Sequence, residues 1–371
     1  MSGRYVLAAG GTGGHLFPAE GLAGELLSEG GKVHLVSDAR AEAFAGRFSE
    51  IETHHVRAAQ LGGGAAHAAH AIGELAIGTL QARRLLRRLA PACVIGFGGY
   101  ASIPTMLAAV SLGLPTLIHE QNAVLGRANR LLAPRVRRIA TGFPSTAGLR
   151  PADHVRTSHT GNPVRPAVLA LARTKYRAPQ RGGPIELIIL GGSQGARIMS
   201  EAVPPALAAL PTRLREMLRV SHQARPEDLP ATEAIYQKNR IHAEVLNFFT
   251  DVPERLARAQ LAICRAGAST LAELAAVGRP AVLIPYPHAT DDHQAVNARA
   301  FAEAGAGWVI EQPELRPDTL ALYLENLLGD CTGMGNAAQR ASDLGRPDAA
   351  AHLARLAIEL GLSSWQHGQA A

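Results

Sequence analysis

The feature that most constrains the fold is a pattern that occurs three times: an apolar run, a glycine-rich loop, and then an amphipathic segment. The three loops are residues 10–15, 96–100 and 191–196. Apolar runs that do not alternate with polar residues indicate strands buried on both faces, and the amphipathic segments indicate helices. Strands alternating with helices form parallel sheets that helices cover on both sides. The sequence therefore predicts a doubly wound α/β protein.

The predicted elements fall into two groups, separated by residues 161–185, which are rich in proline and glycine and form the best linker candidate. We expect strands at residues 5–9, 32–37, 93–96, 115–119, 138–142, 186–190, 243–248, 261–264 and 281–285. We expect helices at residues 18–29, 104–113, 197–210, 269–278, 293–304, 318–328 and 349–360. Each group opens with strand, glycine loop and helix, which predicts two Rossmann-like domains with ligands at the carboxyl ends of the strands.

Composition limits the class of protein. A length of 371 residues fits two domains, and 47% hydrophobic against 18% charged residues excludes a disordered chain. An aromatic content of 4% argues against single-stranded nucleic-acid binding by base stacking. The three cysteines are far apart, which excludes a disulfide framework and a cysteine zinc site and fits a reducing compartment.

The excess positive charge behind the net charge of +6 lies in the N-terminal part of the sequence. Residues 1–165 hold 17 Lys and Arg against 10 Asp and Glu, whereas residues 166–371 hold 20 against 21. Such asymmetry indicates an anionic partner: nucleic acid, a membrane surface or a phosphorylated substrate. No apolar run reaches the roughly 18 residues of a membrane span, and the N-terminus does not resemble a signal peptide, so we expect a cytosolic protein.

The glycine loops suit phosphate binding, because they present backbone N–H groups beside a helix N-terminus. The alternative is that glycine serves only close strand–helix packing. A dinucleotide fingerprint is broken at Leu16, although Asp38 stands where a ribose-binding acid would. There is no Gly-Lys-Ser/Thr P-loop and no Asp-x-Asp pair for a metal-bound nucleotide sugar.

Two further clusters follow predicted strands. His119, Glu120, Gln121 and Asn122 form either a solvated turn or a group that binds sugar hydroxyls or orients a base. Residues 264–273 (CRAGASTLAE) open a helix whose free N–H groups could hold phosphate, with Glu273 on ribose hydroxyls. The competing interpretation is helix capping, with Ser269 as N-cap and Glu273 as dipole partner.

Seven motifs in this order resemble the MurG family of N-acetylglucosaminyltransferases. They are residues 10–18 (GGTGGHLFP), 96–104 (GFGGYASIP), 119–122 (HEQN), 161–165 (GNPVR), 191–197 (GGSQGAR), 264–273 and 285–297 (PYPHATDDHQAVN). The resemblance covers roughly residues 4–310 and implies the GT-B fold, two Rossmann-like doubly wound domains facing across a cleft. It implies an N-terminal acceptor and membrane-facing domain at 1–163, a donor-binding domain at 164–344, and a C-terminal helix at 345–371 that packs back on the first domain.

The resemblance also implies the reaction. The donor would be UDP-N-acetylglucosamine (UDP-GlcNAc), and the acceptor would be lipid I, undecaprenyl-pyrophosphoryl-MurNAc-pentapeptide. Inverting transfer to the MurNAc 4-hydroxyl would give lipid II for peptidoglycan synthesis, with consequences for cell-wall biogenesis, cell shape, cell division and the cell cycle. The enzyme would be peripheral at the cytoplasmic face of the bacterial inner membrane. Cell-wall synthesis or division proteins are candidate partners, and nucleic acid is not.

Matched position by position, the resemblance implies a donor site with contributions from both domains. Its residues are Thr12, Gly13, Gly14, Asn122, Arg165, Ser193, Phe249, Ala268, Ser269, Thr270, Leu271, Ala272, Glu273 and Gln294. Asn122 would bind the GlcNAc, Arg165 and Ser193 the diphosphate, and Glu273 the ribose. Phe249 stands where the family usually has an aliphatic residue whose backbone reads uracil, so the pocket wall is expected to differ. Acceptor binding falls to Gly98, Gly99 and Tyr100.

Inverting transfer needs a base for the acceptor hydroxyl, and His15 is our candidate, with Glu120 as alternative base or orienting partner. The competing role of His15 is a loop or pyrophosphate contact. Backbone N–H groups, a helix N-terminus and Arg165 can stabilise departing UDP. The sequence therefore requires no cofactor and assigns no metal ligand, and it leaves divalent-metal dependence open.

Residues 72–89 combine leucines and isoleucines with Arg83, Arg84, Arg87 and Arg88, which predicts either an anionic-membrane contact or an ordinary amphipathic helix with solvated arginines. The rival enzyme classes are another GT-B glycolipid transferase and a UDP-GlcNAc epimerase. A nucleic-acid-binding module is disfavoured by the few aromatics and the lack of a recognised motif.

Overall fold

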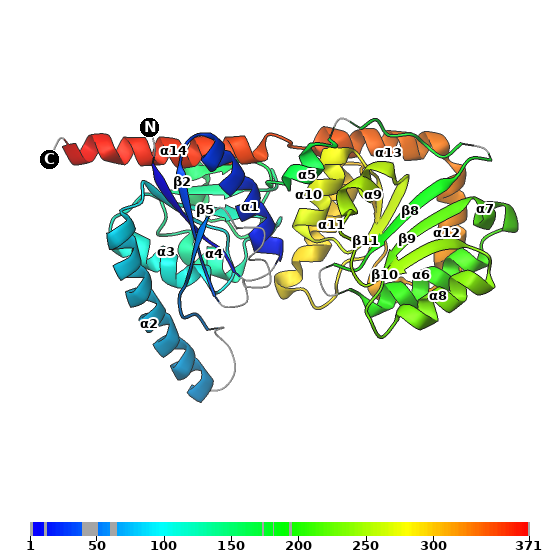
Figure 1. The fold of residues 1–371 in the computed structure, drawn as a ribbon, viewed down its shortest axis with the longest axis horizontal. Helices are drawn as coiled ribbons and strands as arrows, with labels where there is room; N and C mark the ends of the chain where they lie inside the picture. Colours follow the sequence, from blue (N-terminus) through cyan, green and yellow to red (C-terminus); the bar gives the residue numbers. More distant parts are fainter. Residues whose placement is uncertain are drawn as a thin grey trace. The chain divides into compact units, whose positions relative to one another are not determined.

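The computed structural model describes residues 3–10, 13–38, 51–59, 65–172, 174–180, 182–192 and 195–369. The chain forms two compact units (Figure 1). Unit 1 comprises Met1–Arg165 and Arg346–Ala371, and unit 2 comprises Pro166–Gly345. Each unit contains one sheet, and its strand pairs are parallel.

The sheet of unit 1 has seven strands in the order β3-β2-β1-β4-β5-β6-β7. They are β3 (Glu52–His55), β2 (Lys32–Ser37), β1 (Arg4–Ala8), β4 (Cys93–Gly96), β5 (Thr116–Glu120), β6 (Arg138–Thr141) and β7 (Thr157–His159). The helices are α1 (Gly13–Ser28), α2 (Ala65–Leu89), α3 (Ser102–Ser111), α4 (Arg127–Leu132), the 3₁₀ turn η2 (Pro151–Arg156) and α14 (Ala349–Gln369).

Helices cover both faces of this sheet, because successive side chains of a strand point to opposite sides. Leu7 of β1 packs with Leu22 of α1 and Leu353 of α14. Val6, its neighbour in the strand, packs in a second cluster with Leu86 of α2. Helices α2, α3 and α4 supply that second cluster, whereas α14 lies along α1 and against β4 (Figure 1).

The sheet of unit 2 has six strands in the order β10-β9-β8-β11-β12-β13. They are β10 (His242–Leu246), β9 (Leu218–Gln223), β8 (Ile185–Leu190), β11 (Leu261–Cys264), β12 (Ala281–Leu283) and β13 (Gly307–Val309). The helices are α5 (Pro166–Leu169), α6 (Arg197–Ala209), α7 (Thr212–Met217), α8 (Leu229–Lys238), α9 (Val252–Arg258), α10 (Ala268–Val277), α11 (His293–Glu303), α12 (Pro317–Gly329) and α13 (Cys331–Leu344), with 3₁₀ turns η3 (Thr290–Asp292) and η4 (Gln312–Glu314).

The prediction of two doubly wound Rossmann-like units is confirmed, although the sequence did not predict α4, α5, α7, α8, α9 or α13 and other elements need correction. The first helix begins at Gly13 rather than at Pro18, and Pro18 lies inside it. His15 therefore belongs to the first turn of α1 and not to a loop. Four strands were missed, namely β3, β7, β9 and β13, because they are short, polar or both.

Candidate active site

Unit 1 gathers most of its predicted site residues at one edge of its sheet. Strands β1, β4 and β5 are neighbours and parallel, so the segments that follow them emerge at the same edge. The described parts of these segments are residues 9–10 and 13–15, 97–101 and 121–126. The backbone N–H of Gly10 donates to the carbonyl oxygen of Gly98 over 3.1 Å, which joins the first two segments directly.

Glycines allow these segments to approach each other. Gly98 and Gly99 have φ values of +85° and +74°, in the left-handed region that side chains rarely adopt. A Cβ on Gly99 would lie 2.9 Å from the Cα of Gly10 and 2.9 Å from Cδ2 of His15. The imidazole of His15 therefore rests against the backbone of the second loop, and only glycine leaves room for it.

A chain of polar contacts fixes the orientation of His15. Nδ1 of His15 lies 3.3 Å from Oε1 of Gln121. Nε2 of Gln121 lies 3.1 Å from Nδ1 of His119 and donates to the His119 carbonyl oxygen over 3.0 Å. Nε2 of His119 in turn donates to the carbonyl oxygen of Gly161 over 2.9 Å. The chain leads from the first turn of α1 through the buried interior to the glycine of the 161–165 motif.

The donor and acceptor of each hydrogen bond in this chain follow from the two backbone carbonyl oxygens that it contacts, those of Gly161 and His119. Burial lowers the pKa of His119 to about 4, so its imidazole is neutral at physiological pH. Its Nε2 must carry the proton to bond a carbonyl, so its Nδ1 accepts from the Gln121 amide. The amide oxygen of Gln121 then accepts from Nδ1–H of His15. A neutral His15 consequently holds its lone pair on Nε2.

Glu120 organises the next loop. Its side chain is 2% exposed, and its oxygens accept four hydrogen bonds. Oε1 accepts from the backbone N–H and the side-chain amide of Asn122, over 3.0 and 3.1 Å. Oε2 accepts from Gly126 N–H and Asn129 Nδ2, each over 2.9 Å. The carboxylate thus fixes the half-buried Asn122, a predicted sugar-binding residue.

The other predicted residues of unit 1 lie close by in the chain. Gly13 and Gly14 form the first turn of α1, and Gly14 is exposed. The Arg165 guanidinium carbon lies 5.1 Å from the ring centre of Phe17, one turn along the same helix. Tyr100, half-buried, directly follows Gly99. Thr12 lies outside the described residues.

Unit 2 places most of its predicted residues after two adjacent strands, β8 and β11. The loop after β8 needs glycine, since a Cβ on Gly191 would lie 2.3 Å from the backbone nitrogen of Ala196 and Gly195 has a φ of +69°. Helix α6 follows without a side-chain cap. Ser193 lies outside the described residues. In the described part of this loop, backbone groups rather than side chains are therefore the groups that a ligand could contact.

The loop after β11 leads into α10, whose N-cap is Gly267 and whose first turn has no side-chain cap. The alternative prediction that Ser269 caps this helix is wrong: the helix begins at Ala268, and the Ser269 hydroxyl makes no hydrogen bond within the described structure. Thr270 and Ala272 are half-buried, Leu271 belongs to the core, and Glu273 is 6% exposed. An uncapped helix start has backbone N–H groups to offer a ligand.

Three more residues of unit 2 have contacts that fix their side chains. Arg265, directly after β11, donates to the carbonyl oxygens of Ile284 and Pro285 over 3.0 and 2.9 Å. Burial lowers the pKa of Arg265. Oε1 of Gln294 accepts from the backbone N–H of Tyr286 over 3.0 Å. The ring of Phe249 is buried, with the Arg255 guanidinium carbon 4.2 Å from its centre.

Within unit 1 the structure thus brings together His15, Glu120, Asn122, Gly98 and Gly99, and within unit 2 the α10 residues lie beside the β8 loop. Sequence reasoning gave no separate role to His119, Gln121 or Arg265. The available signal was their position, because each of these polar side chains lies in the last two residues of a buried strand or directly after it.

Comparison with known proteins agrees with this organisation. Residues 5–141 match the glycosyltransferase family 28 N-terminal domain, and residues 186–353 match the family 28 C-terminal domain. A Rhodospirillum centenum protein named UDP-N-acetylglucosamine–N-acetylmuramyl-(pentapeptide) pyrophosphoryl-undecaprenol N-acetylglucosamine transferase is 54% identical, covering 94% of this chain and 92% of its own. A protein of the same name from Paramagnetospirillum magneticum is 51% identical, covering 96% of each chain. The crystal structure of Acinetobacter baumannii MurG matches with a TM-score of 0.78 and 31% identity, over 96% of this chain and 99% of that one.

Proposed function

The chain belongs to glycosyltransferase family 28, and we propose that it transfers GlcNAc from UDP-GlcNAc to the MurNAc 4-hydroxyl of lipid I, forming lipid II. The expected linkage is β-1,4 with inversion. Two relatives at 54% and 51% identity that carry this activity in their names support the substrates. In this proposal unit 1 receives the acceptor and unit 2 binds most of the donor.

The observation that carries the mechanism is the proton arrangement at His15. The Gln121 amide oxygen holds the proton of His15 on Nδ1, which directs the Nε2 lone pair away from the relay. Nε2 takes the proton of the acceptor hydroxyl as its oxygen attacks C1 of the donor. A bond forms between that oxygen and C1, the bond from C1 to the UDP oxygen breaks, and the configuration at C1 inverts.

Glu120 is less suited to act as the base. Each of its oxygens already accepts two hydrogen bonds, which come from Asn122 and Gly126 of the loop and from Asn129 of α4. Accepting a substrate proton would break this set. We therefore assign Glu120 a positioning role through Asn122, which would hold the GlcNAc, while Gly98, Gly99 and Tyr100 receive the acceptor.

Departing UDP needs positive charge or N–H donors. The uncapped starts of α6 and α10 supply N–H groups, and Arg165 supplies a cation. The unpartnered Ser269 hydroxyl and buried Glu273 are suited to the diphosphate and the ribose hydroxyls. The proposed donor residues are Thr12, Gly13, Gly14, Asn122, Arg165, Ser193, Phe249, Ala268, Ser269, Thr270, Leu271, Ala272, Glu273 and Gln294.

We further propose that α2 contacts an anionic lipid surface, which would place the enzyme peripherally at the cytoplasmic face of the inner membrane. Among the described residues, no helix has the length and apolarity of a membrane span. Helix α2 exposes Ile72, Ile77 and Leu80 at 60%, 42% and 59%. Its other face buries Leu86 and Leu89 in the core. The exposed arginines of its last two turns are suited to lipid phosphates.

Vesicle flotation tests this membrane contact. Arg83 donates to Ser111 over 2.7 Å, so the informative variant changes only the exposed Arg84, Arg87 and Arg88 to Gln. The control changes three exposed arginines of unit 2, Arg213, Arg316 and Arg340. We expect the first triple variant alone to lose binding to anionic vesicles. Equal binding by both variants would contradict the contact.

One assay tests the activity: transfer of labelled GlcNAc from UDP-GlcNAc to a lipid I analogue, with and without chelator. We expect a disaccharide product that requires the acceptor. The main rivals are another glycolipid transferase and a UDP-GlcNAc epimerase. Epimerised donor in the absence of acceptor would favour the second rival, and transfer only to a different lipid would favour the first.

A further inference from the structure

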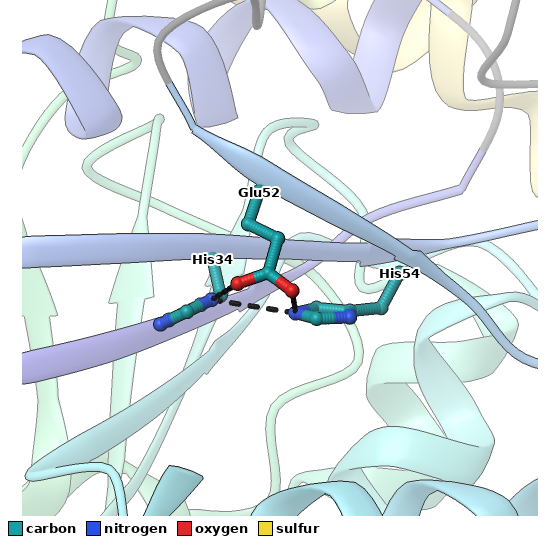
Figure 2. A group of neighbouring side chains, drawn as sticks. All are labelled: His34, Glu52 and His54. Carbon is teal, nitrogen blue, oxygen red and sulfur yellow. Dashed lines mark hydrogen bonds and ion pairs between the residues drawn. The ribbon is translucent and has the colours of Figure 1, made fainter.

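A cluster outside the active site lies on β2 and β3, the two outermost strands at one edge of the unit 1 sheet. The parallel register pairs His34 with Glu52 and Val36 with His54. Residues two apart in a strand share a face, so His34, Glu52 and His54 point to the same side. Figure 2 shows the two imidazoles and the carboxylate converging.

The facing atoms are close and are all of a kind that binds metal. Nδ1 of His34 and Nε2 of His54 are 3.3 Å apart. Glu52 Oε2 lies 3.4 Å from the first nitrogen, and Oε1 lies 3.6 Å from the second. Among the described residues, this is the group of three His, Cys, Asp or Glu side chains close enough to hold one ion.

The spacing of the two imidazole nitrogens is that of neighbouring ligands in a zinc site. Zinc–nitrogen and zinc–oxygen bonds of about 2.0–2.1 Å in a tetrahedron place neighbouring ligand atoms roughly 3.3 Å apart. The two nitrogens are 3.3 Å apart, which matches this value, and each of them faces a different oxygen of Glu52, over 3.4 and 3.6 Å. We propose that His34, His54 and Glu52 bind a zinc-type divalent ion, with water completing the coordination.

Burial and chemistry both favour this ion. The His34 and His54 side chains are 12% and 13% exposed, so the protein holds the rings in place, whereas Glu52 is 64% exposed and leaves an open path for the ion. Two imidazoles favour zinc, cobalt or nickel over magnesium or calcium, which prefer oxygen ligands. Two facing nitrogens at this distance need a shared proton or a cation between them, and the carboxylate adds charge that favours a cation.

The ion would join the edge strand to the sheet. β3 has only four residues, Glu52–His55, all of them polar and exposed or half-exposed, so side-chain burial holds it weakly. Ligands from β3 and β2 would close the chain between residues 34 and 52 into a loop. Binding to the folded state alone stabilises it. The site is therefore structural, and separate from transfer of the sugar.

Metal titration of the untagged, full-length, EDTA-treated protein tests the proposal. We expect one Zn²⁺ per chain with a thermal midpoint raised by several degrees, and Co²⁺ spectra of a four- or five-coordinate nitrogen–oxygen site. Glu52→Gln keeps the shape of an exposed side chain and should weaken binding at least about 10-fold. His34→Gln and His54→Gln should remove it.

His55→Gln is the matched control, because His55 is exposed on the same strand but points to the opposite face. This variant should bind Zn²⁺ as the unchanged protein does. Equal binding by Glu52→Gln and the unchanged protein, or loss of binding in His55→Gln, would overturn the assignment. So would Co²⁺ spectra of a six-coordinate ion that Glu52→Gln leaves unchanged.

Discussion

The two units use the same edge of the same kind of sheet in different ways. In unit 1, the strand ends carry side chains that bond one another in a fixed order, from Gly161 through His119 and Gln121 to His15. In unit 2, the α10 start has no side-chain cap, and the Ser269 hydroxyl makes no hydrogen bond there. The first edge sets one proton in place, whereas the second leaves backbone donors ready for a ligand.

This difference indicates a division of labour. Proton transfer needs one side chain in one tautomer, so it requires a relay that burial protects from water. Holding a diphosphate needs several weak donors that pre-exist in any uncapped helix start. Substitutions at the strand ends of unit 1 should therefore lower kcat, and substitutions at the strand ends of unit 2 should raise the KM for UDP-GlcNAc.

The largest effect should follow His15→Ala. Loss of the base should lower kcat by about 10³-fold with little change in KM, since general bases contribute roughly 10²–10⁴-fold. Steady-state transfer at saturating substrates measures this, and added imidazole should restore part of the rate. Near-normal turnover would contradict the assignment and favour a purely binding role.

Gln121→Leu should come next. It leaves His15 in place but removes the acceptor that holds its proton on Nδ1. We expect kcat to fall by roughly 10²-fold while the KM for donor stays constant, because a histidine in the wrong tautomer is a poor base. Gln121→Glu keeps an acceptor at this position and should be less impaired. Equal rates for the two variants would exclude tautomer control.

Glu273→Gln tests the proposed donor site at the strand ends of unit 2. Losing a charged partner for the ribose hydroxyls should cost about 2 kcal/mol of donor binding, or roughly 30-fold in KM, with kcat nearly unchanged. The control is Glu325→Gln, an exposed carboxylate on α12. A fall in kcat without a change in KM would break the proposed contrast between the units.

The smallest effect concerns stability. Burial lowers the pKa of His119 in unit 1 to about 4 and of His222 in unit 2 to about 3. Below pH 6.5 the unfolded chain takes up these protons first, so each unit loses stability as pH falls towards its folded pKa. Between pH 6.5 and pH 5 each histidine should cost about 1.5 kcal/mol.

Denaturant unfolding measures this for unit 2 when Trp308 is the reporter and Trp365→Phe removes the other tryptophan. His222→Gln should flatten the pH dependence of the Trp308 transition. If the free energy of unfolding of this variant depended on pH as strongly as that of the unchanged protein, other groups would cause the loss of stability at low pH.

The sequence predicted the central strands well, because β11 is apolar throughout, β8 is apolar except for Glu186, and each is bounded by proline, glycine or polar residues. It missed β3, whose residues Glu52–His55 are all polar, since edge strands need no apolar face. It placed the first helix too late by treating Pro18 as a start signal.

The candidate site likewise has residues that the sequence could predict and residues that it could not. Residues in recognisable motifs, such as Glu120 and Glu273, could be named in advance. The relay could not, because it depends on contacts between residues 15, 119, 121 and 161 that only the order of β1, β4 and β5 brings together. The proposed zinc site likewise depends on the register of β2 and β3, and β3 was not predicted.

The position of α14 has a consequence for synthesis. Its residues Leu353, Ala357 and Leu360 fill the core of unit 1, yet all of unit 2 precedes them in the chain. Domains generally fold in the order in which the ribosome releases them. Here the first unit to emerge must wait for α14, so unit 2 can fold earlier, and the unit that carries the proposed base is the last to be completed.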